Sequence, residues 1–180
     1  MQFYEELFEE IKQKNIEDKD SLTKLKTKLA RKYGLSKVPR DIEIFINAKN
    51  KNFGKLLLSK PIRTISGVAP IAIMTAPIAC KHGKCTFCPG GPGSYFGDVA
   101  QSYTGTEPAS RRALRNLNDA YLQVFNRLEH YTLLNQATDK VELIIMGGTF
   151  PSFDVRYQNE FITYAFKAMN DFSEMFYRNN

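Results

Sequence analysis

The apolar residues in the first third of the chain have the spacing of α-helices. Three of them, Phe3, Leu7 and Ile11, share one helical face and predict an amphipathic helix at the N-terminus. A second helix is predicted from about residue 21, and Gly34 is suited to the position after its C-terminal end. A short third helix is predicted after Asp41, whose side chain can cap it. The segment up to residue 63 is therefore predicted to form a small helical domain.

The apolar pattern changes to that of a β-strand after residue 64. Val68, Ile71 and Ile73, with small residues between them, predict a buried strand. Pro70 indicates a bulge or a later start of this strand. A loop rich in glycine, proline, serine and tyrosine follows from residue 76 to residue 106. Loops of this length in compact domains are usually functional.

The rest of the chain alternates helix and strand. One helix is predicted from Pro108, with an apolar stripe that includes Leu114, Leu117 and Leu128. A strand is predicted from residue 141 to residue 146, and a helix from about residue 154 to residue 170, with Tyr164 among its inward residues. Two successive βα units predict an α/β fold with a parallel sheet. The long loop and Gly147-Gly148, which follow the two strands, are then expected side by side.

Charge is distributed unevenly along the 180 residues, whose net charge is +6. Residues 1–63 hold 15 Lys and Arg against 9 Asp and Glu, while residues 64–180 hold 10 of each kind. A basic module joined to a neutral one favours a polyanionic partner. The alternative is that the lysines only solvate helix surfaces. The cations on the outer face of the second helix are the candidates for this contact: Lys24, Lys28, Arg31 and Lys32.

No segment of the sequence predicts a signal peptide or a membrane span. The first ten residues carry four glutamates and no basic residue, and the longest charge-free run is short and contains prolines. We therefore predict a cytoplasmic protein with no membrane partner. In a reducing compartment, clustered cysteines are more often metal ligands than disulfides.

All three cysteines of the chain, Cys80, Cys85 and Cys88, lie in the long loop. Their close spacing predicts one metal centre, and an iron–sulfur cluster is the favoured interpretation. A structural zinc site with His82 or His130 as fourth ligand, and unligated thiols, remain as alternatives. No Ser/His/Asp set, phosphate-binding glycine loop or carboxylate pair stands out, so hydrolysis and phosphoryl transfer lack support.

The cysteine loop, with the motif Cys-x4-Cys-Thr-Phe-Cys-Pro-Gly-Gly, resembles the cluster motif of radical S-adenosylmethionine enzymes. Within that superfamily the chain resembles the Elongator catalytic subunit family, over about residues 37–170. The four residues between the first two cysteines differ from the three typical of the superfamily and resemble the longer spacings of this family. Four segments carry this resemblance: Arg63 to Val68, His82 to Cys85, Gln101 to Pro108, and Asp139 to Phe150.

The resemblance implies a cofactor site with defined residues. Cys80, Cys85 and Cys88 would hold a [4Fe-4S] cluster whose free iron binds S-adenosyl-L-methionine. Gly147 and Gly148 would meet the methionine amino group. The remaining implied cofactor contacts are Thr149 beside these glycines, Phe87 near the adenine, and Lys140, which matches a family lysine that contacts acetyl-CoA.

The resemblance also implies an activity. The family starts a carboxymethyl group at C5 of the wobble uridine of tRNA, with acetyl-CoA and S-adenosylmethionine. Residues 1–63 would be a basic helical tRNA-binding module, and residues 64–180 a truncated radical domain holding the first two βα units of a partial (β/α) barrel. Family members continue through the rest of the barrel and an acetyltransferase-like domain. We therefore interpret the sequence as a truncated or partial chain, with a separate chain as one candidate source of these parts. The alternative is a non-catalytic tRNA-binding module with a structural metal site.

Overall fold

The computed structural model of the protein describes residues 2–48, 53, 56–58 and 64–177. By its internal contacts the chain forms two compact units, one of residues 1–67 with 131–137 and one of residues 68–130 with 138–180. Arg63, which begins the first resemblance motif and ends the predicted first module, lies outside the described residues. The predicted division into a tRNA-binding module and a radical domain stays a prediction.

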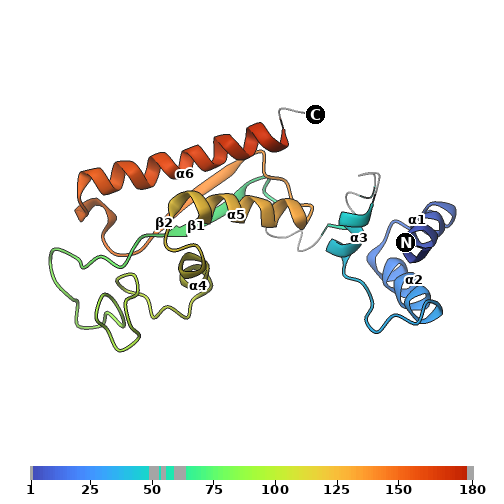
Figure 1. Ribbon diagram of the computed structural model, residues 1–180, viewed down its shortest axis with the longest axis horizontal. Coiled ribbons are helices and arrows are strands. Elements are labelled where there is room, and N and C mark those ends of the chain that lie inside the picture. The colour runs from blue at the N-terminus through green and yellow to red at the C-terminus, as the bar shows by residue number, and fades with distance from the viewer. Residues whose placement is uncertain (1, 49–52, 54–55, 59–63, 178–180) are drawn as a thin grey trace. The chain divides into compact units, whose positions relative to one another are not determined.

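The first unit contains three helices, α1 (Gln2–Gln13), α2 (Lys19–Lys32) and α3 (Asp41–Asn47) (Figure 1). The predicted apolar face of α1 is buried, as are the leucines of α2. α2 begins two residues earlier than expected because the Asp18 carboxylate accepts a hydrogen bond from the Ser21 amide at 2.8 Å and caps the helix. These buried residues form one core: Phe3, Leu7, Ile11, Leu22, Leu25, Leu29, Ala30, Ile44, Leu56 and Leu57.

The end of α2 has the predicted form, but the start of α3 does not. Gly34 follows α2 with φ of +62°, and the next amide, of Leu35, donates to the Ala30 carbonyl at 2.9 Å. The prediction that Asp41 caps α3 was wrong, because the cap position is Arg40. The Asp41 carboxylate instead binds the ammonium groups of Lys19 and Lys26, at 2.5 and 2.6 Å. It therefore ties α2 to α3.

The second unit is built on a parallel pair of strands, β1 (Ala69–Met74) and β2 (Val141–Met146). The register pairs the two strands residue by residue, from their first residues to their last. Pro70 causes no bulge. The Ala69 amide donates to the carbonyl of Lys140, the residue before β2, and the Thr75 amide donates to that of Met146 in β2. Alternate N–H groups of β1 therefore face the partner strand, and the proline nitrogen is turned away. The predicted α/β character and parallel pairing are confirmed.

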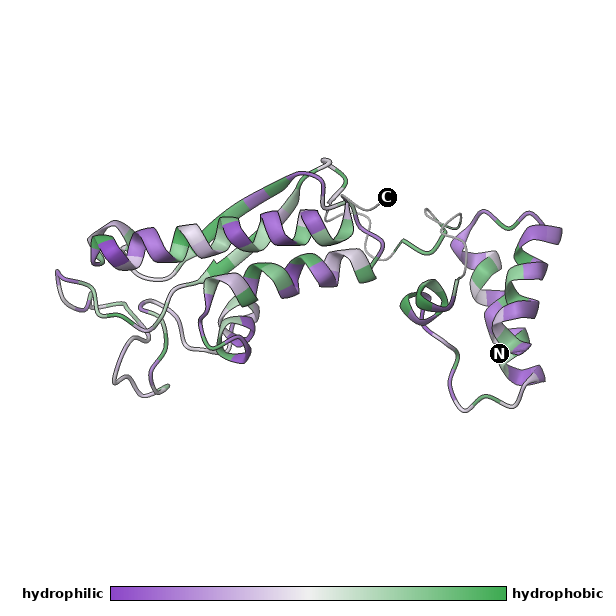
Figure 2. Cartoon of the chain, turned by 45° about the horizontal axis from the view of Figure 1, so that its top comes forward, coloured by the Kyte–Doolittle hydropathy of each residue, from purple (hydrophilic) through white to green (hydrophobic). Residues whose placement is uncertain are grey.

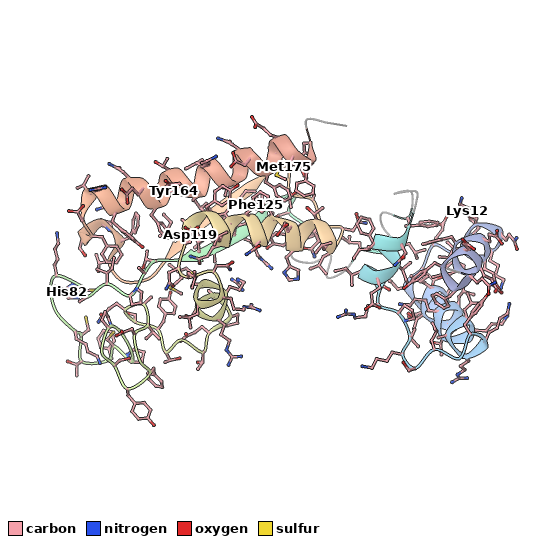
Figure 3. All side chains as sticks on the ribbon, viewed as in Figure 1. Lys12, His82, Asp119, Phe125, Tyr164 and Met175 are labelled. Atoms are coloured by element: carbon pink, nitrogen blue, oxygen red, sulfur yellow. The ribbon has the colours of Figure 1, made fainter. Side chains whose placement is uncertain are left out.

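The helix predicted from Pro108 onward is two helices, α4 (Pro108–Arg115) and α5 (Ala120–Leu133). Leu117 and Asn118 have φ of +54° and +55°, which breaks the helix. The Asp119 carboxylate then accepts from the Leu122 amide at 2.8 Å at the start of α5 (Figure 3). As a result Leu114 and Leu117, predicted on the apolar stripe, are 47% and 83% exposed.

The last elements are a short 3₁₀ helix, η3 (Phe150–Ser152), and α6 (Val155–Phe176), which continues past the predicted end at residue 170. α6 runs beside α5 along the two strands (Figure 1). The rings of Phe125 and Phe172 meet edge to face at 5.4 Å, and the Tyr121 hydroxyl donates to Asp171 at 2.9 Å. Tyr164 is 52% exposed, contrary to the expected inward position, whereas Phe161, Ala165 and Ala168 are buried.

Within the described ranges the sheet has two strands, which is less than a closed barrel requires. The same residues contain no helix with the length and apolar character needed to cross a membrane.

Candidate metal and cofactor site

The loop after β1 carries the cysteines in three different environments. Cys80 is half-buried, Cys85 is exposed and Cys88 is buried. Two tight turns shape the loop, one closed by the Gly83 amide on the Cys80 carbonyl and one by the Cys88 amide on the Cys85 carbonyl, both at 3.0 Å. His82 also lies on this loop (Figure 3), with its Nε2 3.5 Å from the Cys85 sulfur.

Cys88 is held by a later part of the same loop. The Gln101 side-chain amide donates to its Sγ at 3.3 Å, and the Ser102 hydroxyl lies 3.6 Å from the same sulfur. The contacts with Ser102, and then the bond from Gln101, lower the pKa of the Cys88 thiol against the opposing effect of burial. A lowered pKa favours the thiolate, which is the form that binds metals.

The glycine turn after β2 lies against the cysteine loop, as the parallel pairing predicts. A Cβ atom at Gly148 would lie 2.9 Å from the Cys80 sulfur. The Thr149 hydroxyl is 4.0 Å from that sulfur. The predicted adjacency of the two loops is therefore confirmed, and a side chain at residue 148 would displace the first cysteine.

Gly147 fits its position for two reasons. Its φ is +139°, and a Cβ there would lie 2.1 Å from the hydroxyl oxygen of Thr75, the residue that follows β1. Thr75 is fully buried, and its hydroxyl makes no hydrogen bond within the described part of the protein. The glycine turn thus covers a buried hydroxyl for which the described residues provide no hydrogen-bond partner.

The donor chemistry of this region fits a cysteine-ligated cluster. It offers three free thiols on one turn-rich loop, one of them with a lowered pKa, beside a bare glycine backbone. In residues 2–48, 53, 56–58 and 64–177, however, no three His, Cys, Asp or Glu side chains are gathered closely enough to hold a metal. His130 lies on α5, with its Nδ1 3.0 Å from an Arg127 nitrogen. The ligand set of Cys80, Cys85 and Cys88 stays a prediction.

The two other predicted cofactor residues lie in different places. Phe87 is on the cysteine loop and 88% exposed, so its ring is free to meet a ligand. Lys140 is exposed and immediately precedes β2, whereas Gly147 immediately follows it. The two residues therefore lie at opposite ends of the strand. The structure does not bring Lys140 together with the cysteines. A cavity of about 440 Å³ opens at the Lys140 end of the strand, lined by Thr138, Asp139 and residues of α5 and α6.

The basic face of α2 is only partly as predicted. Lys24, Lys28 and Arg31 are exposed and, with two threonines, line a groove of about 470 Å³. Figure 2 shows the hydrophilic character of the outer faces of α1 and α2. Lys32 differs, because its ammonium group binds both carboxylate oxygens of Glu6, at 2.5 and 2.7 Å. The candidate surface for binding anions is therefore the groove with Lys24, Lys28 and Arg31, and it does not include Lys32.

The sequence also matches a known protein family model and several known proteins. Residues 1–65 match the family described as the ELP3 N-terminal domain. The chain is 46% identical over 171 residues to a tRNA uridine(34) acetyltransferase of Methanocaldococcus infernus, which covers 93% of this chain and 32% of that protein. Over most of its own length the chain is therefore similar to proteins named tRNA uridine(34) acetyltransferase and Elongator complex protein 3. The resemblance found in the motifs is thereby confirmed.

Two further relatives match smaller parts of the chain. The tRNA uridine(34) acetyltransferase of Methanocaldococcus jannaschii is 57% identical over 115 residues, or 64% of this chain and 21% of that protein. Elongator complex protein 3 of Homo sapiens is 44% identical over 158 residues, or 83% of this chain and 29% of that protein. The chain thus spans about a third or less of the length of these relatives.

Sequence reasoning gave no role to three residues that shape this region, Thr75, Gln101 and Ser102. Gln101 and Ser102 were part of a resemblance motif, so a signal existed, but their contact with Cys88 depends on how the loop folds back. Thr75 carried no signal, because its position under Gly147 follows only from the pairing of the strands.

Proposed function

We propose that the chain is the N-terminal part of a radical S-adenosylmethionine enzyme that modifies the wobble uridine of tRNA at C5, with acetyl-CoA as co-substrate. One observation carries the proposal: the cysteine loop and the glycine turn meet at one sheet edge, where the Gly148 backbone approaches the Cys80 sulfur too closely for any side chain. The name of the two Methanocaldococcus relatives, tRNA uridine(34) acetyltransferase, supports the tRNA substrate and the acetyl donor.

In this proposal Cys80, Cys85 and Cys88 hold a [4Fe-4S] cluster, and the donor set described above fits it. When bound, the cluster would supply the electron for reductive cleavage of S-adenosyl-L-methionine. Gly147, Gly148 and Thr149 would hold the methionine part of that molecule against bare backbone, and Phe87 would cover its adenine. The two strands would be the first of a (β/α) barrel whose remaining strands lie in the rest of the protein or in a separate chain.

The same proposal gives the helical unit the task of binding tRNA. The groove on α2 presents Lys24, Lys28 and Arg31 to solvent, which suits phosphate groups. Lys32 would contribute less, because its charge is already paired with Glu6. Lys140 would contact acetyl-CoA from the other edge of the sheet, and a cytoplasmic location would suit both the thiols and the substrate.

The cluster is tested by anaerobic reconstitution of the whole chain with iron and sulfide. We expect a brown protein that cleaves S-adenosylmethionine when reduced, and loss of both properties in Cys88→Ala. Cys80→Ala and Cys85→Ala should behave alike, because a cluster with only two cysteine ligands is poorly held. A colourless protein that binds one zinc ion under these conditions would contradict the proposal and support a structural site.

The nucleic-acid contact is tested by tRNA binding at several salt concentrations. Lys24→Gln/Lys28→Gln should weaken binding and lower the salt dependence by roughly one unit of slope per lost phosphate contact. Lys12→Gln/Lys37→Gln removes the same charge from exposed positions outside the groove and is the matched control. Equal weakening by both pairs would mean that net charge, and not the groove, attracts the RNA.

A non-catalytic tRNA-binding module is the second candidate, and the groove on α2 favours it. It predicts that Cys88→Ala binds tRNA as tightly as the unaltered chain and that no condition yields cleavage of S-adenosylmethionine. The two assays together separate the candidates, because only the enzyme requires both the groove and the cysteines.

A further inference from the structure

Gln101 is a buried polar residue to which the roles above give no task. It is 6% exposed and lies where three segments meet. Its amide nitrogen donates to the Cys88 sulfur at 3.3 Å. Its Cβ lies 3.0 Å from where a side chain at Gly148 would begin, and its amide oxygen lies 2.6 Å from the corresponding point at Gly91. One side chain therefore lies against the last cysteine, Gly91 and the glycine turn after β2.

The backbone that carries Gln101 is fixed on both sides. Gln101 lies within a sharp turn, in which the Ala100 carbonyl accepts from the Tyr103 amide at 3.1 Å and Ser102 has φ of +72°. After it, the Glu107 carboxylate accepts from the Thr104 amide and hydroxyl and from the Ser110 hydroxyl, each at 2.9 Å. The turn is thus fastened to the first residues of α4.

We propose that Gln101 is a positioning residue that couples Cys88 to the Gly147-Gly148 turn, and so holds the two halves of the cofactor site in register. This inference rests on the proposed function. The amide fixes the direction of the Cys88 sulfur, while the methylene stem sets how closely the glycine turn can approach. Asparagine is too short to span both contacts, and glutamate as a carboxylate cannot donate to the sulfur.

The same hydrogen bond would act on a bound cluster. Hydrogen bonds to cluster sulfurs contribute to the reduction potential, because they stabilise the added negative charge of the reduced state. Loss of the Gln101 bond is therefore expected to lower the potential, in addition to loosening the site. A residue that only fills space would not produce the first effect.

A second buried glutamine provides a matched control. Gln123 on α5 is 5% exposed, and its side chain accepts from the Met74 amide at 2.8 Å and donates to the Met74 carbonyl at 2.9 Å. It thus binds the last residue of β1 through two hydrogen bonds, and no cysteine is among its hydrogen-bond partners in the described residues. Replacing it by leucine removes two buried hydrogen bonds, against one at Gln101, so the control is at least as disruptive to local packing.

The first measurement is hydrogen exchange, read by mass spectrometry, on the whole chain without iron. Gln101→Leu keeps the volume but loses the donor, and we expect about tenfold faster exchange both at residues 85–91 and at residues 147–149, the cost of one buried hydrogen bond. Gln123→Leu should accelerate exchange around β1 and leave residues 85–91 unchanged. The inference fails if Gln101→Leu affects only one of the two segments, or if Gln123→Leu affects both equally.

The second measurement is the midpoint potential of the reconstituted cluster. We expect a lower potential in Gln101→Leu than in the unaltered chain, and an unchanged potential in Gln123→Leu. Equal potentials in the unaltered chain, Gln101→Leu and Gln123→Leu would contradict the proposal that Gln101 positions the Cys88 sulfur. If the unaltered chain assembles no cluster, the proposed function fails, and the exchange measurement still decides whether Gln101 couples the two loops.

Discussion

The helical unit and the cysteine loop reach order by different means. α1, α2 and α3 bury large apolar side chains against one another, and the loop from residue 76 to residue 106 is ordered instead by glycines, turns and side chains bonded to backbone. Cys88 is buried there, while Cys85 and Phe87 in the same tight turn are exposed. The difference teaches that a helical core tolerates changes at its surface, whereas the loop is sensitive wherever two backbones touch.

The largest effect is expected from removing core volume in the helical unit. Leu7 is fully buried, and Leu7→Ala should reduce the free energy of unfolding of this unit by about 2–5 kcal/mol, through lost burial and a residual cavity. Urea denaturation followed by circular dichroism measures it. Ile46 is 63% exposed, and Ile46→Ala serves as the control with little expected change. Similar losses at both positions would show that the unit has no fixed core.

A smaller but more local effect is expected from adding volume to the loop. A Cβ at Gly90 would lie 1.8 Å from the backbone oxygen of Tyr103, so Gly90→Ala should cost about 1–3 kcal/mol and expose Cys88 to alkylating reagents. Gly34→Ala in the helical unit is the contrast, since it meets no atom and carries only the strain of φ +62°, roughly 1 kcal/mol. If Gly90→Ala leaves Cys88 protected, the loop is looser than its contacts indicate.

The smallest effect concerns the pH dependence of the loop. Hydrogen bonds from Thr104, and also from Ser110, lower the pKa of Glu107 to about 2. A lowered pKa contributes stability above the ordinary carboxyl value of 4.5, and this contribution is lost as the pH falls from there toward 2. The protection of the Thr104 amide against hydrogen exchange, measured relative to its intrinsic rate at each pH, should therefore fall over that range. In Glu107→Gln this pH dependence should disappear, and its persistence would assign it to another carboxylate.

Much of the fold could be predicted from local pattern. The apolar spacing of α1 and α2, the glycine after α2 and the two βα units are decided by neighbours in the sequence, so they followed from periodicity and turn chemistry. The break between α4 and α5 could also have been read from Asn118 and Asp119, which favour turns and caps. The apolar stripe across Leu114 and Leu117 outweighed that signal in the prediction.

The candidate site divides in the same way. The sequence by itself determined which groups carry the chemistry, because the cysteine spacing, the glycine pair and the basic helix are local features. Only the tertiary structure decided which of them meet. The parallel register sets Gly148 against Cys80 and leaves Lys140 at the far edge, the fold of the loop brings Gln101 to Cys88, and an ion pair with Glu6 occupies Lys32. Such contacts join residues distant along the chain, and no local pattern specifies them.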